Sequence, residues 1–358
     1  MQTPEKLDIA SSFKNYSVTF EASVSDAILA ASPRGKRIFF LVDSNLPPIQ
    51  EELANLLRSS PTLNLSATEE NKSIETVKHV CNWLLNQGAD KSAHLIAVGG
   101  GVIQDIATFT SHIFYRGISW SMLPTTLLAM ADSSIGGKCA INLDGFKNQL
   151  GVIHPPNHVS IFSGFLGSLP EQEVQSGFGE ILKLSLTGDL EFYDEFKIRV
   201  EEFGLSKIGI NDLIWLSLNA KKTIIEIDES EGNLRRVLNY GHTFGHALES
   251  ASAHAVTHGQ AIVFGMDVIN FIGRKLGHTD SHFEVDFREF AAKNFHLRAL
   301  VQQASLHIDS LFSLISRDKK VLNGEVHFAF AQSKGRLHIE PVRLDQNLKN
   351  LLNEYFQQ

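Results

Sequence analysis

The sequence predicts two domains: an α/β domain with a parallel sheet over residues 1–170 and a mostly α-helical domain over residues 171–358. A chain of 358 residues exceeds the usual size of one domain. Short apolar runs alternate with helical patterns in the first half, whereas long helical patterns dominate the second. The change falls at Ser168-Leu169-Pro170-Glu171. A serine followed three residues later by glutamate, with proline in the first turn, is typical of a helix start.

In the first half, residues 37–42 form a buried apolar run that predicts a strand. Residues 75–87 have apolar side chains at helical spacing, and Gly88 follows as a stop signal. Residues 94–98 predict a second strand that leads into Gly99-Gly100-Gly101. The order strand, helix, strand, glycine-rich turn indicates a parallel sheet with crossover helices.

In the second half the helical patterns follow one another with few strand signals. The predicted helices cover residues 171–186, 211–226, 237–253 and 259–276 and a C-terminal stretch.

Composition excludes several classes of protein. Hydrophobic residues make up 43% and charged residues 20%, as in an ordinary globular protein, and the net charge of −8 with scattered Lys and Arg does not suggest a nucleic-acid or membrane partner. No segment resembles a signal peptide or a membrane span. The two cysteines, Cys81 and Cys139, lie far apart, which disfavours a disulfide framework and fits a cytoplasmic protein.

The triple glycine predicts a dinucleotide site. Glycines after a strand let backbone amides approach a pyrophosphate, and the following helix N-terminus favours its negative charge. Asp43 at a strand end suits a ribose hydroxyl, and Thr125 and Thr126 offer further hydroxyls. The spacing is not GxGxxG, so the Rossmann motif is absent. In isolation each feature could equally be a plain turn or strand end.

A second group of residues predicts a metal centre beside an anion-binding surface. Spacings of four, four, three and four separate Glu231, Arg235, Asn239, His242 and His246. If this stretch is largely helical, all five lie on one face. A core-facing stripe would be apolar, and a solvated one would rarely hold two histidines among glycines. The alternative is two structural histidines on an ordinary charged face.

Three protein ligands and an open position are typical of catalytic zinc. The candidate ligands are Glu180, His242 and His258. His246 lies one helical turn from His242 and could also bind the metal, whereas His254 is a weaker candidate. Spacing alone does not choose among them.

Cationic residues recur within the same motifs. Any one of them would ordinarily be solvated, but together they suggest a substrate with at least two anionic groups, phosphate plus carboxylate. These residues are Arg116, Lys138, Lys147, Lys183, Lys221 and Arg235.

Together these motifs resemble the 3-dehydroquinate synthase family of the sugar phosphate cyclase superfamily, in order from Asp43 to Lys320. The matching segments are Gly99-Gly-Gly-Val-Ile-Gln-Asp105, Tyr115-Arg-Gly117, Leu123-Pro-Thr-Thr-Leu-Leu-Ala129, Asp132-Ser-Ser-Ile-Gly-Gly-Lys138, Lys147-Asn148, Glu180-Ile-Leu-Lys183, Asp228-Glu229, Leu238-Asn-Tyr-Gly-His-Thr-Phe-Gly-His246 and His258-Gly259.

The resemblance implies an enzyme that holds NAD and a divalent metal, zinc or cobalt, and acts on a small anionic sugar phosphate. It would convert 3-deoxy-arabino-heptulosonate 7-phosphate to 3-dehydroquinate and phosphate by transient NAD oxidation, phosphate elimination, re-reduction and intramolecular aldol closure. It would be a carbon–oxygen lyase, and a homodimer.

The resemblance also assigns roles by motif. The metal ligands are Glu180, His242 and His258. The catalytic set is Glu231, His246, Lys138, Arg235 and Asn239. Substrate contacts are Arg116, Asp132, Lys138, Asn148, Lys183, Lys221, Arg235, Asn239, His246, Lys319 and Lys320. The NAD set is Asp43, Asn45, Glu69, Lys72, Gly100, Gly101, Val102, Asp105, Thr125, Thr126, Lys147 and Ser168.

The chain departs from the family pattern at five positions. Gln104 and Thr108 stand where glycine is common, Cys139 where threonine is common, Phe146 where glycine is usual and Gly179 where alanine is usual. Most of these are changes of shape near the cofactor turn and the substrate floor.

Three other functions remain open. A cyclase that makes valiolone-type or inosose-type rings would use the same chemistry without a substrate carboxylate. A metal-dependent alcohol or glycerol dehydrogenase would release NADH. A non-catalytic homologue would not keep the candidate ligands.

Overall fold

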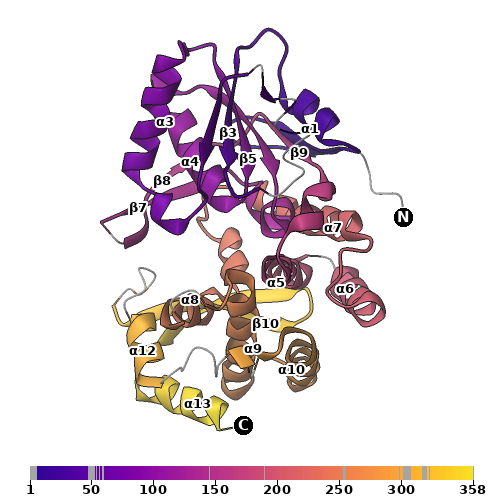
Figure 1. The fold of residues 1–358 in the computed structure, drawn as a ribbon. Coiled ribbons are helices and arrows are strands. Elements are labelled where there is room, and N and C mark those ends of the chain that lie inside the picture. Colours follow the sequence, from indigo (N-terminus) through magenta and orange to yellow (C-terminus); the bar gives the residue numbers. More distant parts are fainter. Residues whose placement is uncertain are drawn as a thin grey trace. The chain divides into compact units, whose positions relative to one another are not determined.

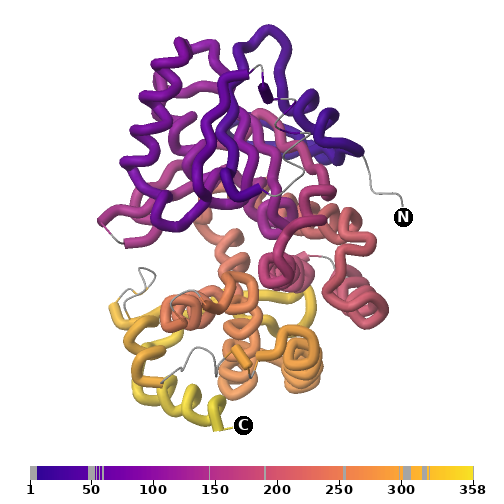
Figure 2. Tube along the Cα trace, viewed as in Figure 1, coloured from indigo at the N-terminus to yellow at the C-terminus, as the bar shows by residue number. Residues whose placement is uncertain are grey.

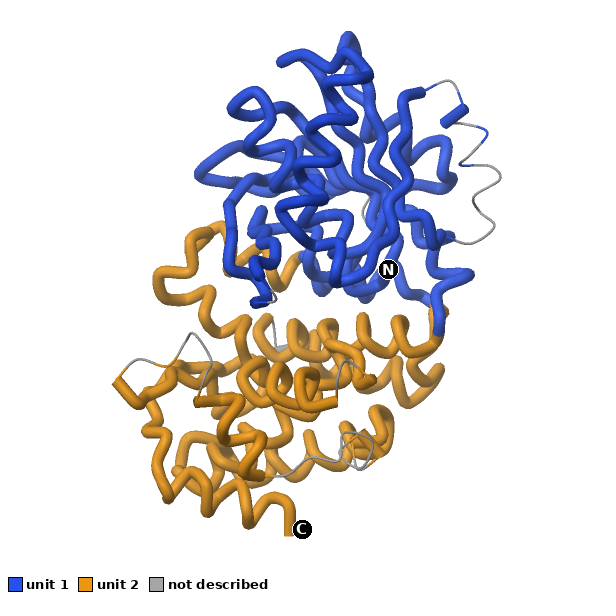
Figure 3. The backbone as a smooth tube through the Cα atoms, turned by 60° about the vertical axis from the view of Figure 1, so that its left-hand side comes forward, with its two compact units in different colours: residues 1–170, 209–218 blue, residues 171–208, 219–358 orange. Residues whose placement is uncertain are grey.

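The computed structural model describes residues 6–46, 53, 55, 57–58, 60–144, 146–188, 190–252, 255–297, 299–300, 308–316, 321 and 323–357. The chain forms two compact units (Figure 3). Unit 1 comprises Met1–Pro170 and Gly209–Leu218, and unit 2 comprises Glu171–Ile208 and Asn219–Gln358. One boundary thus falls between Pro170 and Glu171, and residues 209–218 group with the first unit.

Unit 1 is built on a seven-stranded sheet in which only the outermost pair of strands, β1 and β2, is antiparallel. Its order across the sheet is β1 (Lys6–Ile9), β2 (Tyr16–Phe20), β9 (His158–Ile161), β6 (Ser119–Pro124), β5 (His94–Gly99), β3 (Ile38–Asp43) and β4 (Thr62–Leu65). The predicted strands 37–42 and 94–98 are confirmed as β3 and β5. Strand β5 is buried along its whole length, and its residues 95–98 form a continuous apolar run.

Helices cover both faces of this sheet (Figure 1). They are α1 (Val24–Ala31) on one face and α3 (Ile74–Asn86) and α4 (Gly101–Ile113) on the other. Short helical turns lie at η1 (Glu69–Asn71), η2 (Phe114–Arg116), η3 (Ala129–Ser133) and η4 (Ser163–Ser168). The core packs sheet residues such as Leu95 and Trp120 against Val80 and Ile106.

Helix α3 shows how a local sequence pattern can define a helix from its first to its last residue. The Ser73 hydroxyl accepts a hydrogen bond from the Thr76 N–H at 3.3 Å and so caps the first turn. Val77, Val80 and Leu84 are buried on one face. Gly88 follows the helix with φ +71°, the left-handed conformation that glycine adopts freely.

Unit 1 also contains a hairpin that was not predicted, β7 (Lys138–Leu143) paired with β8 (Phe146–Ile153). Its strands carry Lys138, Cys139 and Asn148.

Unit 2 is mostly helical. The helices among its described residues are α5 (Glu171–Thr187), α6 (Leu190–Phe203), the end of α7 (Ile210–Ile225), η5 (Leu234–Asn239), α8 (His242–Ala251), α9 (His258–Leu276), α10 (Ser281–Phe295), α12 (Ile308–Ser316) and α13 (Gln346–Phe356). The C-terminal stretch is not wholly helical as predicted, because β10 (Glu325–Ser333) and β11 (Arg336–Arg343) form an antiparallel hairpin there.

Helix α9 forms the centre of unit 2. Residues 259–273 are buried on every side, as expected for a helix surrounded by other elements. It packs against α5, α8 and α10 and follows the predicted range 259–276 (Figures 1 and 2). The ion pair of Arg288 with Asp267 at 3.1 Å joins α10 to α9, and Arg288 also pairs with Glu284 at 2.7 Å within α10.

The predicted helix over residues 237–253 is wrong at its start. Residues 234–239 form the short helix η5, and α8 begins only at His242. Gly241 between them has φ +77°, and a Cβ there would lie 2.7 Å from the Ile262 carbonyl oxygen on α9. The chain therefore turns at a glycine pressed against a neighbouring helix.

Helix α5 begins at Glu171 as predicted, but Ser168 does not cap it. Ser168 ends η4, and its hydroxyl donates to the Phe165 carbonyl oxygen at 3.3 Å.

Among the described helices, none is both long and apolar enough to cross a bilayer.

Candidate functional site

In unit 1 Asp43, the triple glycine and the threonine pair lie at one edge of the sheet. Parallel strands end at the same edge, and β3, β5 and β6 end at Asp43, Gly99 and Pro124. Gly99 pairs with Pro124 in register. Ligands of open α/β sheets bind outside the carboxyl ends of the strands.

The glycine turn and the threonine pair contact each other. The Thr125 N–H donates to the Gly99 carbonyl oxygen at 3.0 Å, and a Cβ on Gly100 would lie 2.9 Å from Thr126 Cγ2. Gly100 is the N-cap of α4 and offers no side chain to its first turn, which Gly101 and Val102 begin. These amides form a backbone cradle that fits a pyrophosphate.

Beside this turn, four of the predicted residues form one polar cluster. Lys72 Nζ lies 2.7 Å from Asp105 Oδ2 and donates to Asn148 Oδ1 at 2.8 Å. Burial lowers the pKa of Lys72, but the Asp105 carboxylate outweighs it and raises the pKa above its usual value. Asn148, predicted as a substrate contact, thus lies among residues predicted for NAD.

Glu69 joins the cluster through a residue that the motifs did not indicate. Asn142 Nδ2 donates to Glu69 Oε1 at 2.9 Å, and Asn142 Oδ1 accepts from the Asn148 N–H at 2.9 Å. Cys139, one of the departures, donates its thiol hydrogen to the Asp105 carbonyl oxygen at 3.1 Å.

The other predicted residues of unit 1 are more dispersed. Asp43 Oδ1 accepts from the Asn45 N–H at 2.9 Å. Arg116 is exposed, with φ +62°. Asp132 lies in η3, Lys138 begins β7, and Lys147 is exposed on β8.

The departure at Gln104 has a structural partner. Its side chain exchanges two hydrogen bonds with Ser133, at 2.6 Å and 2.8 Å, and so joins α4 to η3. Thr108 donates to the Gln104 carbonyl oxygen at 2.7 Å.

In unit 2 the predicted metal ligands come together from three helices. Glu180 on α5 is 1% exposed, and its Oε1 lies 3.0 Å from His258 Nε2 and 3.8 Å from His242 Nε2. Two imidazoles therefore face one buried carboxylate oxygen.

His246 completes a group of three histidines. The ligand atoms of His242, His246 and His258 all lie within 4.8 Å of one another. His246 is exposed, whereas His242 and His258 are half-buried. This nitrogen-rich donor set with a carboxylate suits zinc or cobalt.

Lys183 forms an ion pair with Glu180 one turn along α5, and both side chains are buried. The Lys183 ammonium thus lies beside the carboxylate that contacts His258, and the two opposite charges offset each other.

The His258 imidazole lies between two carboxylates. Its Nδ1 lies 3.1 Å from Glu249 Oε2, opposite the contact of Nε2 with Glu180. Burial lowers the pKa of His258, but the hydrogen bonds and charges of Glu180 and Glu249 outweigh it and raise the pKa to about 9.

A close approach of α5 and α9 places Glu180 beside His258. A Cβ on Gly259 would lie 1.8 Å from the Ser176 carbonyl oxygen, and one on Gly179 would lie 2.2 Å from the Gly259 carbonyl oxygen. The Gly259 N–H donates to Ser176 Oγ at 3.0 Å. The departure to Gly179 thus matches a crossing with no room for a side chain.

Gly259→Ala should destabilise unit 2 by about 1–3 kcal/mol, because the added methyl group must push the two helices apart. Differential scanning calorimetry of the metal-free protein measures the effect. Gly167→Ala is the control, since a Cβ there meets nothing within 4 Å. An unchanged transition in Gly259→Ala would contradict this packing argument.

A turn built by Asp228 carries Glu231 and Arg235, two of the five residues predicted to share a helix face. The Asp228 carboxylate accepts from the N–H groups of Gly232 and Asn233 at 2.8 Å and of Arg235 at 2.9 Å. Desolvation raises the pKa of Asp228, but these hydrogen bonds outweigh it and hold the pKa below its usual value.

Within this turn, predicted residues meet without a continuous helix. Asn239 Nδ2 donates to Glu231 Oε1 at 2.5 Å, although Glu231 has φ +65°. The Arg235 guanidinium is buried and donates to the Glu229 carbonyl oxygen. Lys221 on α7 is also buried. The predictions for Lys319, Lys320 and His254 fall outside the described residues.

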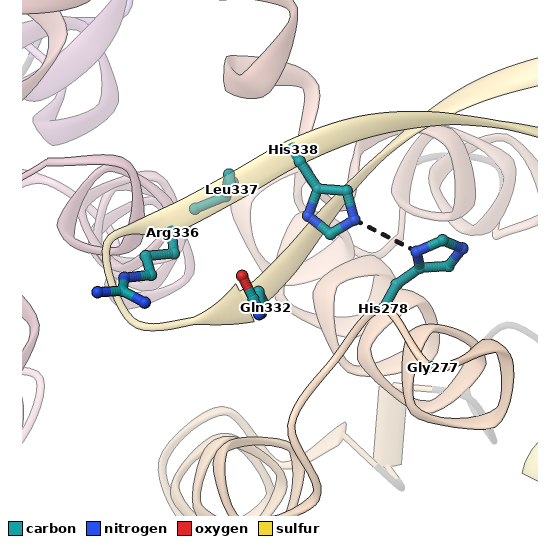
Figure 4. A pocket seen from close by; sticks show the side chains of 6 residues that line it. All are labelled: Gly277, His278, Gln332, Arg336, Leu337 and His338. Carbon is teal, nitrogen blue, oxygen red and sulfur yellow. Dashed lines mark hydrogen bonds between the residues drawn. The ribbon is translucent and has the colours of Figure 1, made fainter.

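A separate pocket of unit 2 contains none of these residues. It is lined by Gly277, His278, Gln332, Arg336, Leu337 and His338 (Figure 4). The two imidazoles face each other, with His338 Nε2 3.3 Å from His278 Nδ1.

The fold of this chain is similar to that of a solved structure. A solved structure titled 2-deoxy-scyllo-inosose synthase complexed with carbaglucose-6-phosphate, NAD+ and Co2+ superposes with a TM-score of 0.87 over 98% of this chain and 99% of that one, at 24% identity. At this identity the match shows that the chain has the fold of that synthase.

The chain belongs to the 3-dehydroquinate synthase family. The family models of the N-terminal and C-terminal parts of 3-dehydroquinate synthase match residues 62–176 and 177–321. The 3-dehydroquinate synthase of Solibacter usitatus is 32% identical over 86% of this chain and 87% of its own length. That of Endomicrobium trichonymphae is 32% identical over 96% of both.

Proposed function

We propose that this chain catalyses the conversion of 3-deoxy-arabino-heptulosonate 7-phosphate to 3-dehydroquinate and inorganic phosphate. The observation that carries the proposal is family membership across residues 62–321, with the two family models meeting end to end. Within this range, the described residues that are predicted to bind metal or anions have side chains suited to those roles. Glu180 also contacts two of the histidines, His242 and His258.

The residues fit NAD and a divalent metal ion. The uncapped N-terminus of α4 with Gly100 and Gly101 would hold the pyrophosphate, and Glu180, His242 and His258 would hold the metal. When bound, NAD supplies a reversible hydride acceptor and the metal ion a Lewis acid.

Buried cations of unit 2 would bind the anionic groups of the substrate. Lys183, Lys221 and Arg235 are 3%, 7% and 4% exposed. A cation held in a low-dielectric position interacts more strongly with a substrate anion than a solvated one does. Arg235 would recognise a carboxylate, because its planar guanidinium matches that group with two hydrogen bonds.

Glu231 and His246 would handle protons. The contact with Asn239 orients the Glu231 carboxylate, and the exposed His246 imidazole adjoins His242 and His258. An imidazole is suited to this role because its ordinary pKa lies close to neutrality.

We also propose a reaction class, a location and an oligomeric state. Loss of phosphate by elimination would make the enzyme a carbon–oxygen lyase. A cytoplasmic location fits the two free cysteines, and a homodimer fits the family resemblance. The rival cyclases, of inosose or valiolone type, would accept a substrate without the carboxylate.

Phosphate release should exceed NADH formation many-fold when the protein turns over the heptulosonate phosphate with only catalytic NAD. NAD would be regenerated in each cycle, so its amount would not limit the product. Phosphate is measured colorimetrically and NADH by absorbance in the same sample.

Heptulose 7-phosphate, which lacks the carboxylate, serves as the comparison substrate. NADH equal to product would instead assign a dehydrogenase. Preference for the heptulose phosphate would assign another sugar phosphate cyclase.

A further inference from the structure

Glu249 contacts the candidate metal centre and was not indicated by the sequence motifs. It lies on α8, its side chain is 17% exposed, and its Oε2 lies 3.1 Å from His258 Nδ1. The opposite nitrogen, Nε2, lies 3.0 Å from Glu180 Oε1. The two ring nitrogens of His258 thus contact two carboxylates, the buried one of Glu180 and the partly exposed one of Glu249.

The position of Glu249 follows from the periodicity of α8. His242, His246 and Glu249 are separated by four and three residues, so they share one face of the helix. The same helix therefore presents a candidate ligand and the partner of another candidate ligand.

The backbone of His258 is fixed independently of Glu249. Thr257 and Gln260 form a capping box at the start of α9, and the Gly259 N–H donates to Ser176. These contacts place the Cα atom of His258 but leave the rotation of its ring to side-chain partners.

The other candidate imidazole has an equivalent partner. His242 Nδ1 lies 3.2 Å from the Tyr240 carbonyl oxygen, while its Nε2 faces Glu180. Histidine ligands commonly donate their second ring N–H to a carbonyl or carboxylate, which fixes the tautomer and the orientation of the ring.

We propose that Glu249 is a positioning residue of the metal centre: its carboxylate accepts the Nδ1–H of His258 and thereby turns Nε2 toward Glu180. The inference rests on the proposed function only in taking Glu180, His242 and His258 as ligands. Glu249 itself would not touch the metal or the substrate.

The test is zinc affinity of the metal-stripped protein, measured by competition with a chromogenic chelator in the absence of NAD and substrate. Glu249→Ala should weaken zinc binding by about 10–100-fold. Glu249→Gln should lose less, because its amide oxygen can accept the same hydrogen bond. Glu289→Gln, an exposed acid on α10, is the matched control and should bind as wild type.

Circular dichroism and the melting temperature of each metal-free variant establish that it is folded. Wild-type affinity in Glu249→Ala would overturn the proposal. Equal losses in Glu249→Gln and Glu249→Ala would do so as well, since the hydrogen bond would then not be the cause. An equal loss in Glu289→Gln would show that the change in net charge causes the weaker binding, and it would also overturn the proposal.

Failure of the proposed function is seen separately. Phosphate release by the wild type reports on the reaction, whereas the zinc series reports on Glu249 whatever the substrate is. A wild-type protein that binds no zinc would overturn the positioning role, even if phosphate release were observed.

Discussion

His242→Ala should lose most of its bound zinc and at least about a hundred-fold in turnover, more than the loss of an outer partner causes. With only three protein ligands, the loss of His242 leaves Glu180 and His258 alone to hold the metal. These two side chains contact each other, at 3.0 Å between Glu180 Oε1 and His258 Nε2. Metal content of the purified protein and phosphate release measure the two effects.

His246→Ala and His282→Ala are the informative comparisons. His282 is exposed on α10, so its replacement should change neither quantity. His246→Ala should keep the metal and lose turnover, in line with a role in proton handling. Full zinc occupancy in His242→Ala together with loss of zinc in His246→Ala would instead move His246 into the ligand set.

The elements that sequence predicted well are those whose signals are local. Strand β5 contains a continuous apolar run, and α3 has both a capping serine and a terminal glycine. For α9 the helical period persists through its whole length. In each case the pattern that folds the segment is contained within it.

The two hairpins were missed although β10 and β11 carry a signal. Val326, Phe328 and Phe330 alternate along β10 and are buried, and Gly335 in the turn has φ +67°. That alternation with a following glycine is typical of a hairpin. The long helical patterns on either side dominate the second half and mask this signal.

The residues from Glu231 to His246 do not lie on one helix, which their spacing would require for a common face. A single helix would have aligned these residues, but the chain turns at Gly241 because α9 lies too close for a side chain. Glu231 and Asn239 still meet, through the turn that Asp228 organises. The contact between Glu231 and Asn239 therefore depends on this turn and not on a shared helix.

Partners that depend on tertiary contacts could not be read from single motifs. Asn142 bridges Glu69 and Asn148 only because the β7–β8 hairpin folds back beside η1. Glu249 pairs with a residue nine positions later on another helix. A helical period extended from His242 would have found Glu249, whereas nothing local indicates Asn142.

Arg235→Ala should reduce turnover of the heptulosonate phosphate by at least about a hundred-fold. A buried guanidinium–carboxylate pair costs about 3–5 kcal/mol to break, and each 1.36 kcal/mol of barrier is about tenfold in rate. Arg235 is buried and held in place through the Asp228 turn and the Glu229 carbonyl oxygen. Steady-state phosphate release at saturating and limiting substrate measures the loss.

Arg236 provides an adjacent control, because it is exposed while Arg235 is buried. Arg236→Ala should turn over as wild type. Arg235→Lys should recover part of the loss, since lysine keeps the charge but not the paired donors. Heptulose 7-phosphate, if accepted, should be turned over equally by Arg235→Ala and wild type, because it has no carboxylate to lose. If the wild type instead prefers that substrate, Arg235 does not recognise a carboxylate. The departures at Cys139 and Phe146 then become the first positions to examine for altered specificity.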